Sequence, residues 1–220
     1  MTVCLLLPVP QWLCWTLIAL LAIVLCWVLS FFRDPHRDIP AGDHLLISPA
    51  DGTVQDIEMV DETSYIGGKA LRIGIFLSIF NVHINRCPCN AKVEKVLYKR
   101  GRFLDARDPQ ATKINESNDI HLLRADAPVE RLLVRQISGA IARRIVCQAK
   151  PGLHLAAGEQ FGMIKFGSRT ELYLPCDSEA QILVKPGDKV RAGATILAQY
   201  PTVSELTDTA ESSTAVQMRK

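Results

Sequence analysis

The segment AQILVKPGDKVRAG, residues 180–193, places a Pro-Gly turn and an Ala-Gly turn between β-prone runs. The same two turns occur with the same spacing 35 residues earlier, in residues 150–158. A unit that recurs at a fixed offset indicates a structural repeat. The pattern therefore predicts a mainly β fold, a barrel-sandwich of short strands in which one hairpin unit is used twice.

Other features of the sequence are consistent with this fold class. Residues 180–193 resemble the hairpins of lipoyl and biotinyl carrier domains. Few segments after the apolar N-terminal stretch favour helix. The polar stretch of residues 101–118 is expected to be a loop over a site. Further strands are expected on both sides of the turn at residues 50–52, at 71–82 with His83 at the strand end, and at 91–98, 121–123, 130–138 and 141–148.

An uncharged segment, residues 12–32, precedes the β region. A helix of this length spans about 31 Å at ~1.5 Å per residue, which is roughly one bilayer core. Because no Lys or Arg precedes it, the segment does not resemble a cleaved signal peptide and should stay attached. Arg33 and Arg37 follow it, so the positive-inside rule places the remaining chain on the cytoplasmic side of the cell membrane. A buried core helix, or a hairpin in one leaflet starting near Pro8 and Pro10, is the alternative.

Composition narrows the class of protein further. With 220 residues, 48% of them hydrophobic, the chain can bury a core, and its net charge of +2 gives no clustered basic face for nucleic acid. We expect a membrane anchor at residues 1–33, one domain at 34–203 and a disordered tail at 204–220.

The cysteines argue against a disulfide framework. All seven are irregularly spaced, which favours a reducing compartment. Cys87 and Cys89 lie near His83, but their spacing is too short for a structural zinc pair and no second pair follows. No metal site is therefore expected.

A Gly-Ser pair, Gly167-Ser168, lies between two apolar, β-prone runs in residues 161–175. Gly167 can adopt backbone angles that other residues avoid, which suits a strained peptide bond between two strands. Most Gly-Ser pairs are ordinary turns. The pair by itself therefore does not indicate a reactive site, and other motifs are needed to support one.

Three other stretches supply that support: residues 32–35 (FRDP), 48–52 (SPADG) and 80–86 (FNVHINR). In this order, with Gly167-Ser168 last, they resemble the phosphatidylserine decarboxylase proenzymes, in particular their short membrane-anchored form. The resemblance covers about residues 31 to 201. It implies conversion of phosphatidylserine in the membrane to phosphatidylethanolamine and CO2, a step of phospholipid biosynthesis.

The resemblance also implies a cofactor made from the chain. Decarboxylation of an amino acid requires an electron sink that no ordinary side chain offers. In this family the serine, here Ser168, attacks the carbonyl of Gly167, and the chain separates into a β chain of residues 1–167 and an α chain of residues 168–220. The new α-chain end becomes a pyruvoyl group, which forms a Schiff base with the substrate amine without pyridoxal phosphate or metal. The two chains stay together as a heterodimer that could assemble further.

Two residues are expected to assist Ser168, because the family motifs map onto Asp51 and His83. We hypothesise that they form a hydrogen-bonded pair that activates the hydroxyl. Longer relatives carry a second histidine where this chain has Arg86, which could instead hold a carboxylate or phosphate. Without the resemblance, His83 would be interpreted as a hydrogen-bonded histidine at a strand edge. Asp51 would be interpreted as a turn residue that precedes a glycine. Asn115-Glu116 also matches a family pattern and is either a substrate contact or part of a solvated loop.

Two other functions remain open. The lipoyl-like hairpin suggests a membrane-tethered scaffold without catalysis, although Lys189 is poorly placed for a modified lysine. Ser168 could also serve a serine hydrolase, but the Gly-x-Ser-x-Gly elbow is missing around it. Only the decarboxylase hypothesis predicts that the chain runs as two pieces.

Overall fold

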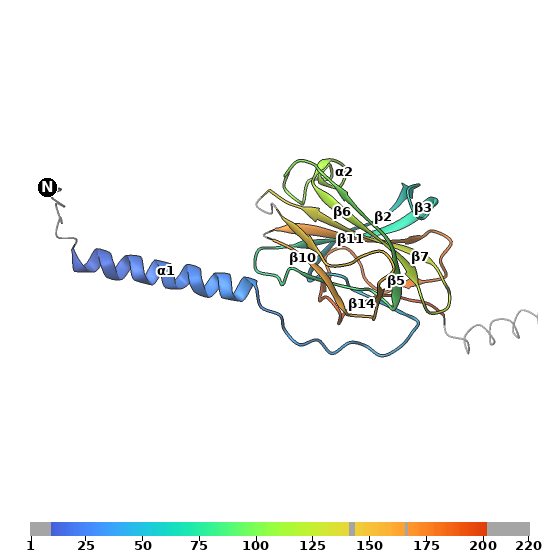
Figure 1. Ribbon diagram of the computed structural model, residues 1–220, viewed down its shortest axis with the longest axis horizontal. Coiled ribbons are helices and arrows are strands. Elements are labelled where there is room, and N and C mark those ends of the chain that lie inside the picture. The colour runs from blue at the N-terminus through green and yellow to red at the C-terminus, as the bar shows by residue number, and fades with distance from the viewer. Residues whose placement is uncertain (1–9, 141–143, 166, 202–220) are drawn as a thin grey trace, which may run out of the picture.

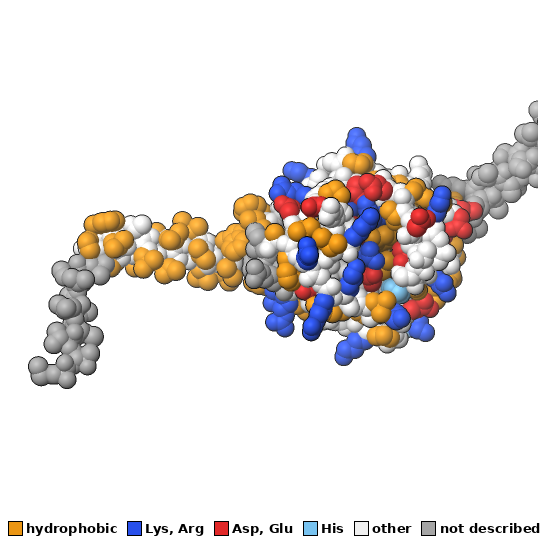
Figure 2. Space-filling model, turned by 90° about the horizontal axis from the view of Figure 1, so that it is seen from above, with side chains coloured by type: hydrophobic (Ala, Val, Ile, Leu, Met, Phe, Trp, Pro, Cys, Tyr) orange, Lys and Arg blue, Asp and Glu red, His pale blue; other side chains and the backbone are white. Residues whose placement is uncertain are grey.

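The computed structural model describes residues 10–140, 144–165 and 167–201, so the expected tail at 204–220 lies outside the described residues. The described part of the chain begins with one continuous helix, α1 (Gln11–Phe31), which extends away from the β domain (Figure 1). Its exposed surface is almost wholly hydrophobic, whereas charged side chains cover the β domain (Figure 2). This helix is long and apolar enough to cross a bilayer, and Phe31 is its one buried residue among those described.

The polar part is mainly β, as predicted, and all its strand pairs are antiparallel. Outside α1 the described helix content is one short turn of helix, α2 (Ala111–Ile114). One curled sheet has eight strands in the order β13 (Lys189–Val190), β2 (Gly52–Glu62), β3 (Gly68–Leu77), β11 (Ser168–Pro175), β7 (Arg131–Ser138), β6 (Ser117–Arg124), β5 (Ala91–Lys99) and β9 (His154–Leu155). Two smaller sheets have the orders β1 (Leu45–Ile47), β14 (Ile196–Gln199), β12 (Gln181–Ile182) and β4 (Ile84–Arg86), β10 (Gln160–Ile164), β8 (Ile145–Cys147).

The predicted duplication is visible in the backbone hydrogen bonds. In one copy the Gly187 N–H donates to the Val54 carbonyl, and in the other the Gly152 N–H donates to the Val93 carbonyl, both at 2.8 Å. The Ala-Gly turns follow the same rule, since Gly193 donates to Ser48 and Gly158 to Cys87, both at 2.9 Å. Each copy thus combines a strand-turn segment early in the chain with a Pro-Gly hairpin late in the chain. The four turn glycines all have positive φ, between 75° and 98°: Gly152, Gly158, Gly187 and Gly193.

The strand expected at residues 71–82 is shorter than predicted. β3 ends at Leu77, because the Asn81 Oδ1 atom accepts hydrogen bonds from the Ser78 backbone N–H and hydroxyl, both at 2.8 Å, and closes a turn. His83 consequently lies beyond this turn, directly before β4, rather than at the end of β3. The turn lets the histidine reach a different sheet.

The hydrophobic core lies between the large sheet and the two smaller sheets. Residues from β3, β11 and β7 form its centre, including Ile73, Leu172 and Val134, all fully buried. The opposite face of the large sheet is polar and carries a network of charges around Glu171, which is also fully buried. β11 is central in this sheet, between β3 and β7, and its first residue is Ser168.

Candidate active site

The Gly-Ser pair stands at the start of β11, where it enters the large sheet. Ser168 pairs with Leu77 of β3 on one side and Ser138 of β7 on the other. Its side chain is fully buried, and its Oγ atom has no hydrogen-bond partner among the described residues. Gly167 has φ of +63°, a conformation that favours glycine. A buried hydroxyl with no partner, next to a left-handed glycine, is an uncommon arrangement that suggests a reactive site.

The carbonyl of Gly167 is packed against a second glycine. A Cβ atom added to Gly139 would lie 2.3 Å from the Gly167 oxygen, so a side chain at position 139 would displace the peptide. Sequence reasoning missed Gly139, although its position directly after the end of β7 is a signal for close backbone approach.

His83 contacts the glycine of the pair. Its Nε2 atom accepts a hydrogen bond from the Gly167 N–H at 3.1 Å, and its Nδ1 atom lies 2.9 Å from the Asn81 carbonyl. The Nδ1–H donor therefore faces a carbonyl, and the Nε2 lone pair faces the candidate cleavage site. Burial lowers the pKa of His83 to about 4, so the ring is neutral at pH 7.

Asp51 does not join this group directly. Its Oδ1 atom accepts from the Ala192 N–H at 2.8 Å, and both carboxylate oxygens accept from Arg37, at 3.0 and 2.8 Å. The hypothesised hydrogen bond between Asp51 and His83 is not found. The reason is that Asp51 caps an Ala-Gly turn, as the Oδ1 atom of Asn90 does in the other copy by accepting from the Ala157 N–H at 2.9 Å.

The last residue of α1 and the six residues that follow it, residues 31–37, which we call the strap, contact the site motifs. The Phe31 ring lies against the His83 ring, with centroids 4.6 Å apart. Arg33 donates to the Phe80 carbonyl at 3.0 Å, and Arg37 forms the ion pair with Asp51. The sequence predicted only a linker here, and the FRDP motif was the available signal that the segment is more than a spacer.

Arg86 also holds the strap. Its guanidinium donates to Asp34 at 2.8 Å and to the Gly158 carbonyl at 2.9 Å. The Asp34 carboxylate accepts a further bond from Gln160 at 2.5 Å. Arg86 thus binds groups of its own chain in this structure, and a role toward substrate stays a prediction.

The two remaining candidates, Asn115 and Glu116, attach the polar loop to the sheet. The Asn115 amide accepts from the Leu104 N–H and donates to the carbonyls of Leu104 and Ser138, all within 2.9 Å. The Glu116 carbonyl accepts from the Ser138 backbone N–H at 2.9 Å. Both residues therefore hold the loop beside β7, the strand whose last residue pairs with Ser168. Contact of either residue with substrate stays a prediction.

A hollow of about 320 Å³ opens beside the pair. Gly167, Ala140, Phe76, Ile79 and Arg107 are among the residues that line it. The hollow is large enough for the head of a small amine, and it reaches Gly167 of the pair.

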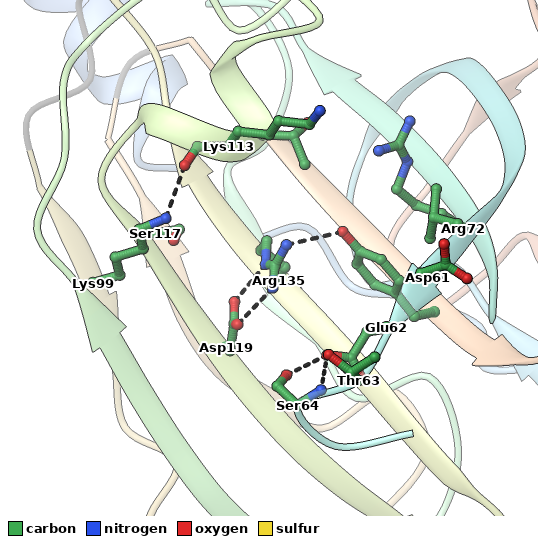
Figure 3. Close-up of a pocket in the computed structure, with 13 residues that line it drawn as sticks. Asp61, Glu62, Thr63, Ser64, Arg72, Lys99, Lys113, Ser117, Asp119 and Arg135 are labelled. Carbon is green, nitrogen blue, oxygen red and sulfur yellow. Dashed lines mark hydrogen bonds and ion pairs between the residues drawn. The ribbon is translucent and has the colours of Figure 1, made fainter. Parts of the chain in front are cut away.

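A separate hollow of about 570 Å³ lies on the polar face of the large sheet (Figure 3). Arg135 pairs there with Asp119 at 2.6 Å and donates to the Tyr173 hydroxyl at 3.1 Å. Tyr173 is five residues along β11 from Ser168, roughly 16 Å at ~3.3 Å per residue. The paired charges in this hollow and its distance from Ser168 indicate a structural network rather than the reaction site.

The family of the chain follows from its similarity to known proteins. The sequence profile of the family described as phosphatidylserine decarboxylase matches residues 25–198. The chain belongs to the phosphatidylserine decarboxylase family. This family assignment makes it a decarboxylase.

Several relatives of this family cover most of the chain. The phosphatidylserine decarboxylase proenzyme of Symbiobacterium thermophilum is 45% identical over 187 residues, 85% of each chain. That of Carboxydothermus hydrogenoformans is 47% identical over 178 residues, 81% of this chain and 82% of its own. That of Rhodopirellula baltica is 44% identical and covers 87% of this chain and 79% of its own. The family resemblance expected from the four motifs is confirmed.

Proposed function

We propose that this protein converts phosphatidylserine to phosphatidylethanolamine and CO2, using a pyruvoyl group that it makes by cleaving itself between Gly167 and Ser168. The observation that carries the proposal is the buried Ser168 hydroxyl, which has no hydrogen-bond partner in the part of the chain that the structure describes, next to a glycine that His83 binds. The relatives are named as decarboxylase proenzymes, which agrees with an inactive precursor.

Self-cleavage needs a nucleophile, a proton acceptor and a fixed peptide. The Ser168 Oγ atom would attack the Gly167 carbonyl carbon, so that a C–O bond forms, the C–N bond breaks and the hydroxyl proton passes to the released nitrogen. Elimination from the resulting ester would then free the carboxylate of Gly167 and leave dehydroalanine at position 168, which water would convert to the pyruvoyl group with release of ammonia. His83 is neutral at pH 7, which is the state that accepts a proton, and its bond to the Gly167 N–H fixes the peptide.

The residues around the pair fit a pyruvoyl group at the new end of β11. A pyruvoyl ketone supplies the electron sink that decarboxylation requires. The hollow beside Gly167 admits the serine head of the lipid, and the burial of Ser168 keeps bulk water away. Among the described residues, His83 is the titratable group that forms a hydrogen bond with this peptide. We therefore propose that it returns a proton to the substrate after CO2 leaves.

The two pieces would remain associated after cleavage. β11 begins with Ser168 and pairs along its length with β3 and β7, which belong to the other piece. Breaking one peptide bond removes none of these ladder hydrogen bonds. A stable heterodimer of residues 1–167 and 168–220 follows.

Helix α1 supports a membrane substrate. Arg33 and Arg37 follow its C-terminal end, so the positive-inside rule places the β domain on the cytoplasmic side. Basic residues near a bilayer contribute about 1 kcal/mol each toward anionic lipid. A lipid headgroup therefore suits the site better than a soluble amino acid.

Intact mass spectrometry tests the proposal. The wild type should appear as pieces of 167 and 53 residues (220 − 167), and Ser168→Ala should stay full length. Ser138→Ala is the matched control, because Ser138 is also buried and is paired with Ser168 across the sheet. Cleaved wild type in detergent should release CO2 from labelled phosphatidylserine and lose this activity with hydroxylamine. A Ser168→Ala chain that splits at the same bond would sink the proposal.

A further inference from the structure

A hollow of about 870 Å³ lies beside the reaction hollow. Arg33 lines it from the strap, and Lys189 and Arg191 line it from β13 and the turn that follows. Ser78 and Phe76 line both this hollow and the one that reaches Gly167, so the two spaces adjoin. We refer to the larger space as the basic hollow.

The basic hollow has an excess of positive charge. Its one carboxylate, Asp51, is already paired with Arg37, and both side chains are only 10% exposed. Within the described part of the chain, no ion pair involves Arg33, Lys189 or Arg191. Arg33 donates to the carbonyls of Ser30 and Phe80, which leaves its positive charge uncompensated. Three cations thus face one space without a matching anion.

The position of the hollow indicates where the anion comes from. Arg33 is two residues beyond the end of α1, so this wall lies at the level where the helix would leave a bilayer. Phospholipid phosphates lie at that level. The ligand should therefore carry a phosphate and reach the hollow from the membrane surface.

We propose that the basic hollow binds the phosphodiester of the lipid substrate through Arg33, Lys189 and Arg191, while the amine of the same molecule enters the adjoining hollow beside Gly167. This inference rests on the proposed function, and it assigns the specificity for a phosphate-bearing serine compound to named residues. Ser78, on the wall shared by both hollows, lies between the two ends of the substrate. A free serine molecule would fill the reaction hollow alone and lose the charge-assisted bonds to phosphate.

A binding experiment on the uncleaved chain separates this inference from the decarboxylase proposal. Short-chain phosphatidylserine is titrated onto full-length Ser168→Ala protein in detergent, with and without Lys189→Gln and Arg191→Gln together. The double substitution should weaken Kd roughly tenfold or more, because it removes two cations that would form charge-assisted hydrogen bonds with the phosphate. Lys150→Gln with Lys185→Gln is the control, because it removes the same charge from the tips of the two repeated hairpins, outside the hollow.

The outcomes decide the proposal as follows. Weaker binding in the Lys189/Arg191 variant alone supports it. Equal Kd in all variants, or equal weakening in the control pair, overturns it, because either result removes the specific role of the hollow. Competition by glycerol 3-phosphate would show that a free phosphate ester suffices, whereas competition by short-chain phosphatidylglycerol only would show that the lipid form is required.

In cleaved protein the same variants supply a catalytic readout. Lys189→Gln with Arg191→Gln should process normally and raise KM for phosphatidylserine with little change in kcat, because these side chains bind the phosphate and do not line the hollow at Gly167. If wild type is cleaved but turns over no phosphatidylserine, the decarboxylase proposal fails while the binding titration still tests the hollow. An unchanged KM would contradict the phosphate assignment.

Discussion

Asp51 and Asn90 occupy equivalent positions in the two copies of the repeated unit. Each accepts a hydrogen bond from the backbone of an Ala-Gly turn, Asp51 from Ala192 and Asn90 from Ala157. An amide oxygen is sufficient for this bond, so turn capping alone does not explain a carboxylate at position 51. The carboxylate is explained by Arg37, which binds both of its oxygens.

Replacing Asp51 with asparagine separates these two roles. Asp51→Asn should fold, because its amide oxygen can still cap the turn, but it should accumulate uncleaved chain, because the strap that holds Phe31 against His83 loses its ion pair. We expect a loss of about 1–3 kcal/mol in the free energy of unfolding. Asn90→Ala is the control, expected to lose roughly 1 kcal/mol for each of its two bonds, to the Ala157 N–H and to Asp126, yet to process normally. Mass spectrometry and denaturant unfolding measure both, and normal cleavage of Asp51→Asn would remove the carboxylate from the mechanism.

His83 should make stability depend on pH. Burial lowers its pKa from 6.5 to about 4, so between these values the unfolded chain binds a proton that the folded chain does not. Stability therefore falls as the pH drops through this window, by as much as about 3 kcal/mol at about 1.4 kcal/mol per unit.

Urea unfolding of the full chain in detergent at pH 7 and pH 5 measures this dependence. His83→Gln should be less stable than wild type at pH 7, and the difference should narrow at pH 5, since only wild type loses the contribution of His83. His154→Gln, at an exposed histidine, should leave the pH dependence unchanged. Parallel pH dependence in wild type and His83→Gln would show that the ring is not held neutral by burial.

At the scale of elements, the strap joins helix α1 to the motifs that we propose for catalysis. Its residues Phe31, Asp34 and Arg37 contact His83, Arg86 and Asp51 respectively. Helix α1 therefore ends on the residues expected to process the chain. A different tether of equal length would hold the domain at a membrane but would not supply these contacts.

Arg37→Gln tests the strap directly. The substitution leaves Asp51 buried without its charge partner, so we expect a loss of about 1–3 kcal/mol and slower cleavage. Asp38→Asn, one residue further along and fully exposed, should change neither property. In a double-mutant cycle Arg37→Gln should add little to Asp51→Asn, since both remove the same ion pair. Full additivity would show that the two residues act independently.

At the scale of the whole molecule, Phe31 is the described residue of helix α1 that is buried at the β domain. No residue of the apolar core of α1 is buried against the domain, whereas Phe31 is 1% exposed. Removing residues 1–29 should therefore leave self-cleavage near the wild-type rate, because the strap is intact. The truncated protein should lose sedimentation with vesicles and release CO2 from vesicle phosphatidylserine more slowly. Loss of cleavage in a folded truncation would show that α1 contributes to the site.

The sequence alone determined the fold class, the repeat, the long apolar helix and the family motifs. These features depend on local properties: alternation along a strand, glycine at turns of positive φ, and an uncharged run long enough for a bilayer. Gly167, Ser168 and His83 were identified from motifs for the same reason, and the structure places His83 on the Gly167 N–H.

Only the tertiary structure decided which residues meet. The partner of Asp51 is Arg37 and not His83, Gly139 supports the Gly167 carbonyl, and the strap reaches the site motifs. The turn closed by Asn81 also ended β3 early and directed His83 to a second sheet. These contacts join segments that are far apart in the chain, and many residues have the charge and size to be a suitable partner. The sequence therefore restricts the possible contact partners of each site residue. The packing of the three sheets then decides which of these partners it meets.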